Sequence, residues 1–390
     1  MLSSLRSSQT LSRLLRHLPG QSSLFGPPRR VAETRDYNGF SRPLKEVTPK
    51  RPLGIVTSPG QPGSGSLRAS LPPVLVGDLP GGRLLWPDGS IVTADDTLLR
   101  DTSFWTLCDD GGLHRHPLGS RWRAPRQRRV SGSVLALTSD FANASFGHYV
   151  LDALPRLDYL LRAGRSLAEF DAIVLPSLRS PTLDQLCTAL HLPPERIVRF
   201  TDVEDLVCDH LTFVTFPGWP GNYPADTPCF YRRLLSLPAT PGHRRLYLSR
   251  QNQKRRRLCN ATQVEAVLAR HGFETVFPET DPDTIRKCSE AGIIVGIEGS
   301  NLVNQIFAPP GGAIVLLVDD HWSDLPYACS LAAACGKRFI PVLGEARNIP
   351  ANPQLRWANP HDLHVPTDAL ETSLREAVSP SYATVPSAHP

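Results

Sequence analysis

Apolar runs that suit buried strands alternate with segments of helical periodicity from about Val134 onward. A first set predicts strands over 134–138, 172–176, 196–200 and 211–216, and helices over 145–164 and 182–192. A second set predicts strands over 244–249, 273–277, 293–297, 313–318 and 338–343, with helical segments between them. Strands that alternate with helices predict parallel sheets covered by helices on both faces. The expected fold class is therefore α/β.

A stretch rich in Pro and Gly at 217–229 separates the two sets. We therefore expect two Rossmann-like domains, over 71–230 and 231–378, whose parallel sheets face a central cleft. In such folds ligands bind outside the carboxyl ends of the strands. Within the first domain, the short apolar runs of 71–137 are broken by Gly and Pro, which predicts hairpins or short strands rather than helices.

Both ends of the chain differ in composition from this alternating region. Residues 1–70 are rich in Ser, Pro, Gly and Arg, and we expect a flexible N-terminal segment. Residues 379–390 are expected to be a disordered tail. The first thirty residues contain Arg and Ser but no acidic residue, which fits an organellar targeting segment or, as the alternative, a disordered Arg-rich terminus.

Local signals in the second set predict where two helices begin. Asn260 followed by Gln263 is the spacing of a capping box, and Gly272 marks the end of the same helix. Asp281 and Pro282 predict the start of the next helix, because Pro at the first helical position loses no hydrogen-bond donor that the helix needs.

Composition describes a soluble globular protein: 41% of the residues are hydrophobic, 20% are charged and the net charge is +5. This mild charge would suit an anionic small ligand, acidic lipid headgroups or a weak nucleic-acid contact. No run approaches the ~18 apolar residues of a membrane span. The eight cysteines show no CxxC pair and no metal-ligand spacing, so we expect buried free thiols in a reducing compartment and no bound metal.

The predicted helix over 145–164 carries a possible general base. His148, Asp152 and Arg156 are spaced four residues apart and share one face, and Pro155 should kink the helix or open it locally. A carboxylate beside an imidazole raises its basicity, which would suit removal of a proton. The alternative is an exposed histidine beside an intrahelical ion pair.

A basic loop follows the strand that ends near Ser249. Arg250 lies at the carboxyl end of that strand, and Arg256 and Arg257 lie just before the next helix. Guanidinium groups beside the unpaired backbone N–H groups of a helix start would hold a diphosphate. A solvated basic loop and a nucleic-acid contact are the alternatives, and the lack of interleaved aromatic residues argues against the second.

The strand over 293–297 runs into Glu298, Gly299 and Ser300, before a segment of helical pattern at 301–308. Ser300 is expected to cap that helix, and Gly299 allows a tight turn. The charge of Glu298 would oppose a phosphate, so we expect this carboxylate to face sugar or ribose hydroxyls or to act as a base. The chain contains no P-loop, no GxSxG elbow and no HExxH motif.

In their order and spacing, these three segments resemble the motifs of glycosyltransferase family 61, the group once called DUF563. The first motif matches at Gly147, His148, Tyr149 and Pro155, and the second at Ser249, Arg250, Arg256, Arg257 and Asn260. The third matches from Ala291 to Gly296 and at Gly299, Leu302, Asn304, Phe307, Pro310 and Gly311. Two positions depart from the pattern: Glu298 stands where the family often has His, and Ala261 stands where many members have Glu.

The resemblance implies a GT-B fold and an inverting, metal-independent transfer from a nucleoside diphosphate sugar to a hydroxyl of a glycan or related acceptor. It implies a sugar donor that is UDP-linked and no cofactor. The site residues that we expect for binding the sugar donor are Arg250, Arg256, Arg257, Gly299, Ser300 and Asn304. The catalytic candidates are His148, oriented by Asp152, and Glu298 as the second possible base.

A catalytically silent nucleotide- or glycan-binding protein with the same fold is the alternative function. A protein that binds nucleic acid through the basic loop is a third possibility. For the glycosyltransferase we expect a cytoplasmic location and a part in the synthesis of capsular or envelope polysaccharide. Peripheral association with the inner face of the membrane is compatible with this expectation.

Overall fold

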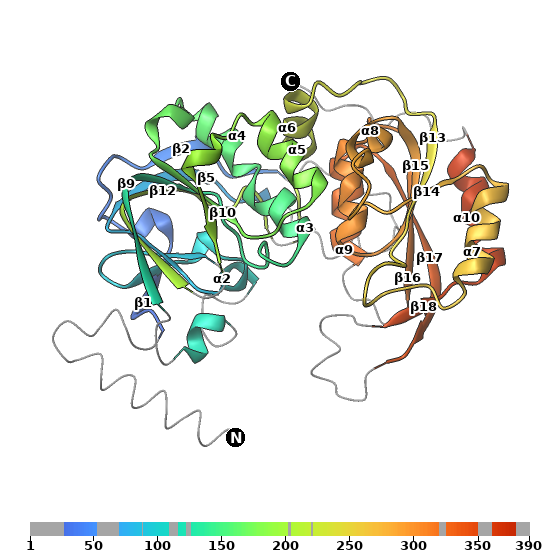
Figure 1. Cartoon of the computed structure of the whole chain (residues 1–390), viewed down its shortest axis with the longest axis horizontal. Coiled ribbons are helices and arrows are strands. Elements are labelled where there is room, and N and C mark those ends of the chain that lie inside the picture. Colours follow the sequence, from blue (N-terminus) through green and yellow to red (C-terminus); the bar gives the residue numbers. More distant parts are fainter. Residues whose placement is uncertain are drawn as a thin grey trace, which may run out of the picture. The chain divides into compact units, whose positions relative to one another are not determined.

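The chain forms two compact units, which are described separately below. The computed structural model describes residues 27–52, 70–87, 89–108, 116–121, 126–201, 204–219, 221–319, 325–349 and 361–379 (Figure 1). Of these residues, 27–52, 70–178 and 192–219 belong to unit 1, and 179–191 with 221–379 belong to unit 2.

Unit 1 is built on a ten-stranded sheet with the order β1-β8-β7-β6-β12-β9-β10-β11, to which β5 and β2 are added through β12. Its strands are β1 (Arg30–Ala32), β2 (Lys45–Thr48), β5 (Val74–Pro80), β6 (Arg83–Leu85), β7 (Ser90–Val92), β8 (Thr97–Leu99), β9 (Arg126–Ala136), β10 (Ala172–Pro176), β11 (Ile197–Phe200) and β12 (Glu204–Val214). The short strands β3 (Arg51–Pro52) and β4 (Ser70–Leu71) form a separate pair.

The expected parallel sheet is only partly present in unit 1. Strands β9, β10, β11 and β12 are parallel to their neighbours in this group. Strand β12, however, pairs antiparallel with β5 and β6, and β6, β7 and β8 form an antiparallel meander. The prediction of a wholly parallel sheet was therefore wrong for this unit, because the hairpins predicted over 71–137 join the same sheet.

Short helices connect the strands of unit 1. They are η1 (Thr34–Asp36), η3 (Arg100–Thr102), α2 (Phe104–Cys108), η4 (Pro117–Ser120), α3 (Phe146–His148), the π-helical turn η5 (Tyr149–Ala153), α4 (Arg156–Arg162), η6 (Leu167–Glu169) and η7 (Pro194–Arg196). The single helix expected over 145–164 is thus divided in three. Pro155 caps α4, as expected of a proline that opens a helix locally, and the π-helical turn lies immediately before it.

Unit 2 has a six-stranded sheet with the order β14-β13-β15-β16-β17-β18. Its strands are β13 (Arg244–Leu248), β14 (Glu274–Val276), β15 (Ala291–Ile297), β16 (Ala313–Asp319), β17 (Arg338–Arg347) and β18 (Asp362–His364). All pairs are parallel except β17 with β18, so the predicted parallel sheet is confirmed here with one antiparallel edge strand.

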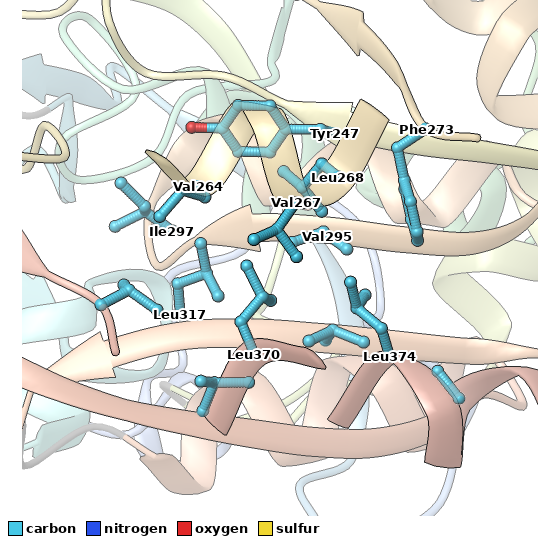
Figure 2. Close-up of a cluster of buried hydrophobic side chains, with 14 of the residues drawn as sticks. Tyr247, Val264, Val267, Leu268, Phe273, Val295, Ile297, Leu317, Leu370 and Leu374 are labelled. Carbon is cyan, nitrogen blue, oxygen red and sulfur yellow. The ribbon is translucent and has the colours of Figure 1, made fainter. Parts of the chain in front are cut away.

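Helices cover both faces of this sheet, with α7 and α10 on one side and α8 and α9 on the other (Figure 1). The helices are α5 (Pro181–Ala189), α6 (Asp226–Leu234), α7 (Ala261–Arg270), α8 (Thr284–Ser289), η8 (Ser300–Phe307), α9 (Leu325–Ala334) and α10 (Thr367–Val378). Figure 2 shows how Val264 and Val267 of α7 and Leu370 and Leu374 of α10 meet Val295 of β15 in one apolar cluster. This core holds the carboxyl ends of the strands in fixed positions.

Three expected helix starts differ from the structure. Asn260 does precede α7, but its side chain bonds to the backbone of Val365 instead of capping the helix, so there is no capping box. Helix α8 is preceded by Asp283, two residues later than expected, and Asp281 accepts a hydrogen bond from the Asp283 amide. Ser300 is not a cap: Gly299 takes that position, and the segment that follows is a 3-10 helix.

Part of the predicted flexible segment is ordered, because residues 27–52 contribute β1 and β2 to the sheet of unit 1. Residues 1–26 and 53–69, and the tail from 380, lie outside the described residues, as do the expectations made for them. None of the helices described is long and apolar enough to cross a membrane. Free, buried cysteines occur as expected at Cys187, Cys208, Cys288, Cys329 and Cys335, whereas Cys259 is exposed.

Candidate functional site

The site in unit 2 lies where the direction of its sheet connections reverses. Strand β13 has β14 on one side and β15 on the other. The connection from β13 to β14 therefore runs toward one edge of the sheet, and the later connections run toward the opposite edge. Leu248 of β13 lies beside Gly296 of β15, and both strands end within two residues of this pair. In open α/β sheets the ligand binds at such a switch point, outside the carboxyl ends. Arg250 and Glu298 follow the two strand ends, as the sequence predicted.

Arg250 is an enclosed cation. Its side chain makes no ion pair and no hydrogen bond with the residues that the structure describes, although only 6% of the residue is exposed. Burial, followed by the charge of Arg256, lowers its pKa to about 10, while Glu298 and Glu279 act in the opposite direction. The guanidinium therefore stays charged at neutral pH. A charge held in this way favours an anionic ligand, since burying an unpaired ion is costly.

Gly299 makes room for that guanidinium. Its φ of 135° is one that residues with a side chain rarely adopt. A Cβ at this position would lie 3.0 Å from Arg250 Cζ and 3.4 Å from Arg256 Cζ, and closer still to Arg250 Nη1. The glycine is therefore favoured by backbone conformation, and it leaves room for the observed position of the guanidinium.

Glu298 is paired with a cation. Its carboxylate forms an ion pair with Arg256, whose own backbone has a φ of 56°. Only 6% of Glu298 is exposed, and the two residues line a small hollow together with Asp319 and His361. The negative charge that was expected to oppose a phosphate is thus balanced within the protein. Whether this carboxylate meets hydroxyl groups stays a prediction.

Two polar residues that the motifs did not indicate, Glu279 and Asn301, also lie at this site. Asn301 Nδ2 donates to the carbonyl of Ser249, at 2.8 Å, and to Glu279 Oε2, at 3.2 Å. Glu279 follows β14, so this amide connects the ends of β13 and β14 with η8. The sequence signal was present, because Glu279 comes shortly after a predicted strand of the same sheet.

The other residues expected to bind the sugar donor lie apart from Arg250. Arg257 is exposed and turned toward β18, where its backbone amide and guanidinium approach Asp362 at 3.0 and 3.6 Å. Asn304 is 1% exposed, and its amide donates to the carbonyl of Asn301. Ser300 is half-buried at the start of η8. The structure therefore brings together Arg250, Arg256, Glu298 and Gly299 from the predicted set.

The histidine pair of unit 1 has the expected geometry. His148 Nδ1 lies 2.7 Å from Asp152 Oδ2, and Asp152 is 6% exposed. Edge-on contact with Phe104, at 5.5 Å between ring centroids, and tilted contact with Phe141, at 5.0 Å, hold the imidazole from two sides. One quarter of the His148 side chain is exposed, which makes the ring accessible while its carboxylate partner is enclosed.

Arg156 does not form the intrahelical ion pair that was the alternative reading. It is fully buried, its Nε donates to the backbone carbonyl of Asp152, and its guanidinium packs over the ring of Phe216. Burial lowers its pKa to about 10, against the opposing charges of Asp152 and Asp140. Arg156 thus binds the backbone carbonyl of Asp152, while the Asp152 carboxylate binds His148.

The parallel sheet of unit 2, with helices on both faces, places this protein in the α/β class. Residues 146–315 match the family model described as Glycosyltransferase 61. The chain carries a glycosyltransferase family 61 domain, and the protein is a glycosyltransferase. The matched region includes all three motifs, from Gly147 to Gly311. No curated protein matches the chain significantly.

Proposed function

We propose that the protein is an inverting, metal-independent glycosyltransferase that uses a nucleoside diphosphate sugar, with UDP as the nucleotide. The observation that carries this proposal is Arg250, an enclosed guanidinium without a protein partner among the described residues, at the switch point of a doubly wound sheet. A diphosphate leaving group needs positive charge to stabilise it, and fixed guanidinium groups supply such charge without a metal.

The ion pairs around Arg250 favour a small anionic ligand, such as a nucleoside diphosphate, over an extended polyanion, such as a nucleic acid. Arg256 and Arg257 are paired with Glu298 and Asp362, so part of the positive charge of this loop is balanced within the protein. Arg250 itself is reached only through the small part of its surface that is exposed. A nucleic-acid backbone is usually bound by basic side chains spread over an accessible face.

The proposed reaction is a single displacement at the anomeric carbon. His148 Nε2 accepts the proton of an acceptor hydroxyl, and the resulting oxygen attacks the anomeric carbon while the bond to the diphosphate breaks. The nucleoside diphosphate leaves on the opposite face, so the configuration inverts. Asp152 holds Nδ1–H, which directs the lone pair of Nε2 outward and stabilises the imidazolium that forms. Glu298 is the second candidate for the base.

Calorimetric titration with pyrophosphate and with UDP tests the proposal. Arg250→Ala should abolish binding of both, because the enclosed cation is removed. The matched control is Arg270→Ala, which removes an exposed guanidinium of the same unit that pairs with Glu371. This control should bind both ligands as the wild type does. Equal affinity of Arg250→Ala and the wild type would exclude Arg250 as the diphosphate ligand.

A further inference from the structure

We propose that Glu279 recognises the ribose of the sugar donor, and that it distinguishes ribonucleotides from deoxyribonucleotides at this site. The inference rests on the proposed function, since it takes Arg250 to hold a nucleoside diphosphate. It adds a residue for recognition of the nucleoside to a site so far defined by its anion-binding groups.

Arg250 and Glu279 each carry a buried polar atom without a hydrogen-bond partner among the described residues. Arg250 Nε, a hydrogen-bond donor, and Glu279 Oε1, an acceptor, are both enclosed, and neither has a hydrogen-bond partner among the described residues. The side chains are near enough for the Glu279 charge to oppose the fall in the Arg250 pKa. A hydroxyl group can accept one hydrogen bond and donate another, so it matches this donor and acceptor together. A phosphate oxygen matches Arg250 alone.

The Glu279 carboxylate is held in place by the side-chain amide of Asn301. Asn301, which is 7% exposed, donates to Glu279 Oε2 and to the carbonyl of Ser249, the residue before Arg250. One amide thus fixes the carboxylate relative to the arginine. Residues that bind a ligand selectively are usually fixed by such supporting hydrogen bonds. Glu279 itself is half-buried, so part of its side chain remains accessible.

The sheet topology also places Glu279 where nucleotide sites of this kind bind ribose. Strands β13 and β14 are the first two strands of the unit 2 sheet in chain order, Arg250 follows the first and Glu279 the second. In doubly wound nucleotide sites the diphosphate lies over the turn after the first strand, and an acidic residue at the carboxyl end of the second strand bonds to ribose hydroxyls. Glu298 follows β15, on the other side of β13, so the two carboxylates flank Arg250. We therefore assign the ribose to Glu279.

The test compares UDP with 2′-deoxy-UDP and 3′-deoxy-UDP by calorimetry, with pyrophosphate as a third probe. The wild type should bind UDP about 10-fold more tightly than at least one deoxynucleotide, the size expected of a hydrogen bond to a charged group. Glu279→Gln should bring this ratio close to one and leave pyrophosphate affinity unchanged or higher, since a negative charge near Arg250 is removed. GDP or CDP with its deoxy counterparts replaces UDP if it is the nucleotide that binds.

The control is Glu274→Gln, which changes a carboxylate of β14 that pairs with Arg244 and Lys287. It should keep the wild-type ratio. A ratio near one in the wild type, or an unchanged ratio in Glu279→Gln, would overturn the assignment and leave an ordered water as the partner of the two atoms. Equal weakening of UDP, deoxynucleotides and pyrophosphate in Glu279→Gln would also overturn it, because Glu279 would then only position Arg250.

The failure of this inference is distinguishable from the failure of the proposed function. If UDP and pyrophosphate bind and Arg250→Ala abolishes their binding, but the ribose ratio does not depend on Glu279, only the present inference is wrong. If no nucleoside diphosphate binds to the wild type, both proposals are wrong.

Discussion

The guanidinium of Arg250 lies against the backbone of Gly299, in the space that a side chain at residue 299 would need. A Cβ there would be 3.0 Å from Arg250 Cζ and closer still to Arg250 Nη1, so the guanidinium would have to move. The two residues are 49 positions apart in sequence, and they come together because β13 and β15 are neighbours in the sheet. The position of the cation therefore depends on the smallest residue in the chain.

Gly299→Ala should weaken UDP binding by at least about 10-fold, because the new Cβ displaces Arg250. It should also lower the free energy of unfolding by about 1–3 kcal/mol, the cost of a non-glycine residue at this φ. Calorimetry and urea unfolding measure the two effects. Gly272→Ala is the matched control: Gly272 also has a positive φ, 72°, but a Cβ there meets nothing within 4 Å. It should lose stability and keep UDP affinity. Wild-type affinity of Gly299→Ala would disprove the steric argument.

The ion pair between Glu298 and Arg256 leads to a second prediction. Glu298→Gln should bind pyrophosphate more tightly, by about 10-fold, because Arg256 is released and a nearby negative charge is lost. Turnover of the nucleotide sugar should fall if the carboxylate meets the sugar or acts in the reaction. Calorimetry and a coupled assay for the released nucleoside diphosphate measure these effects.

Asp362→Asn provides the comparison for Glu298→Gln, since it releases Arg257 in the same way. No gain in pyrophosphate affinity is expected from it, because Arg257 lies apart from Arg250. Tighter binding of pyrophosphate by Asp362→Asn would mean that Arg257 also contacts the diphosphate. Weaker binding of pyrophosphate by Glu298→Gln would mean that the ion pair holds Arg256 in its binding position.

His148→Ala should lower kcat by about 10²–10⁴-fold with little change in the KM for the nucleotide sugar, as expected for loss of a general base. Asp152→Asn should also lower kcat, because an amide beside Nδ1 favours the wrong tautomer. His243→Ala, at an exposed position, is the control. Full turnover of His148→Ala would shift the role of base to Glu298.

His116 makes the stability of unit 1 depend on pH. Ser103 Oγ donates to Asp140, so it accepts from His116 Nε2–H, and His116 Nδ1 accepts the Leu118 amide. Burial lowers the His116 pKa to about 4, below the value of about 6.5 in an unfolded chain. The unfolded chain therefore takes up a proton first as pH falls.

Above about pH 6.5 the uncharged His116 should cost the folded state nothing. Between about pH 6.5 and pH 4 the free energy of unfolding should fall by up to about 3 kcal/mol. Asp101 acts in the opposite direction, because burial raises its pKa to about 6 and acid then favours the folded state. Urea unfolding of the wild type and His116→Gln across this range isolates the histidine, since Asp101 is common to both. His191→Gln, at an exposed position, should behave as the wild type. Parallel pH profiles for the wild type and His116→Gln would contradict the prediction.

Much of unit 2 could be predicted from the sequence, because its strands are apolar runs that are buried on both faces. The strands at 244–249, 293–297 and 313–318 were expected within one residue or two of β13, β15 and β16. The same strand predictions placed Arg250 and Glu298 just past the ends of β13 and β15, where the structure has them. Their part in ligand binding stays a prediction. The capping predictions failed because the Asn260 side chain bonds to Val365, 105 residues away, and no local pattern contains that contact.

The sequence by itself determined the order of strands and helices, the family motifs and the residues that follow β13 and β15, since these depend on local periodicity and on residue type. Only the tertiary structure decided which charges meet. Arg256 and Arg257 are adjacent in the chain, yet one pairs with Glu298 and the other with Asp362. The sheet order likewise brings Glu279 and Asn301 to Arg250. Hydrogen bonds and ion pairs form between groups that are close in space, and the packing of the whole unit sets that proximity.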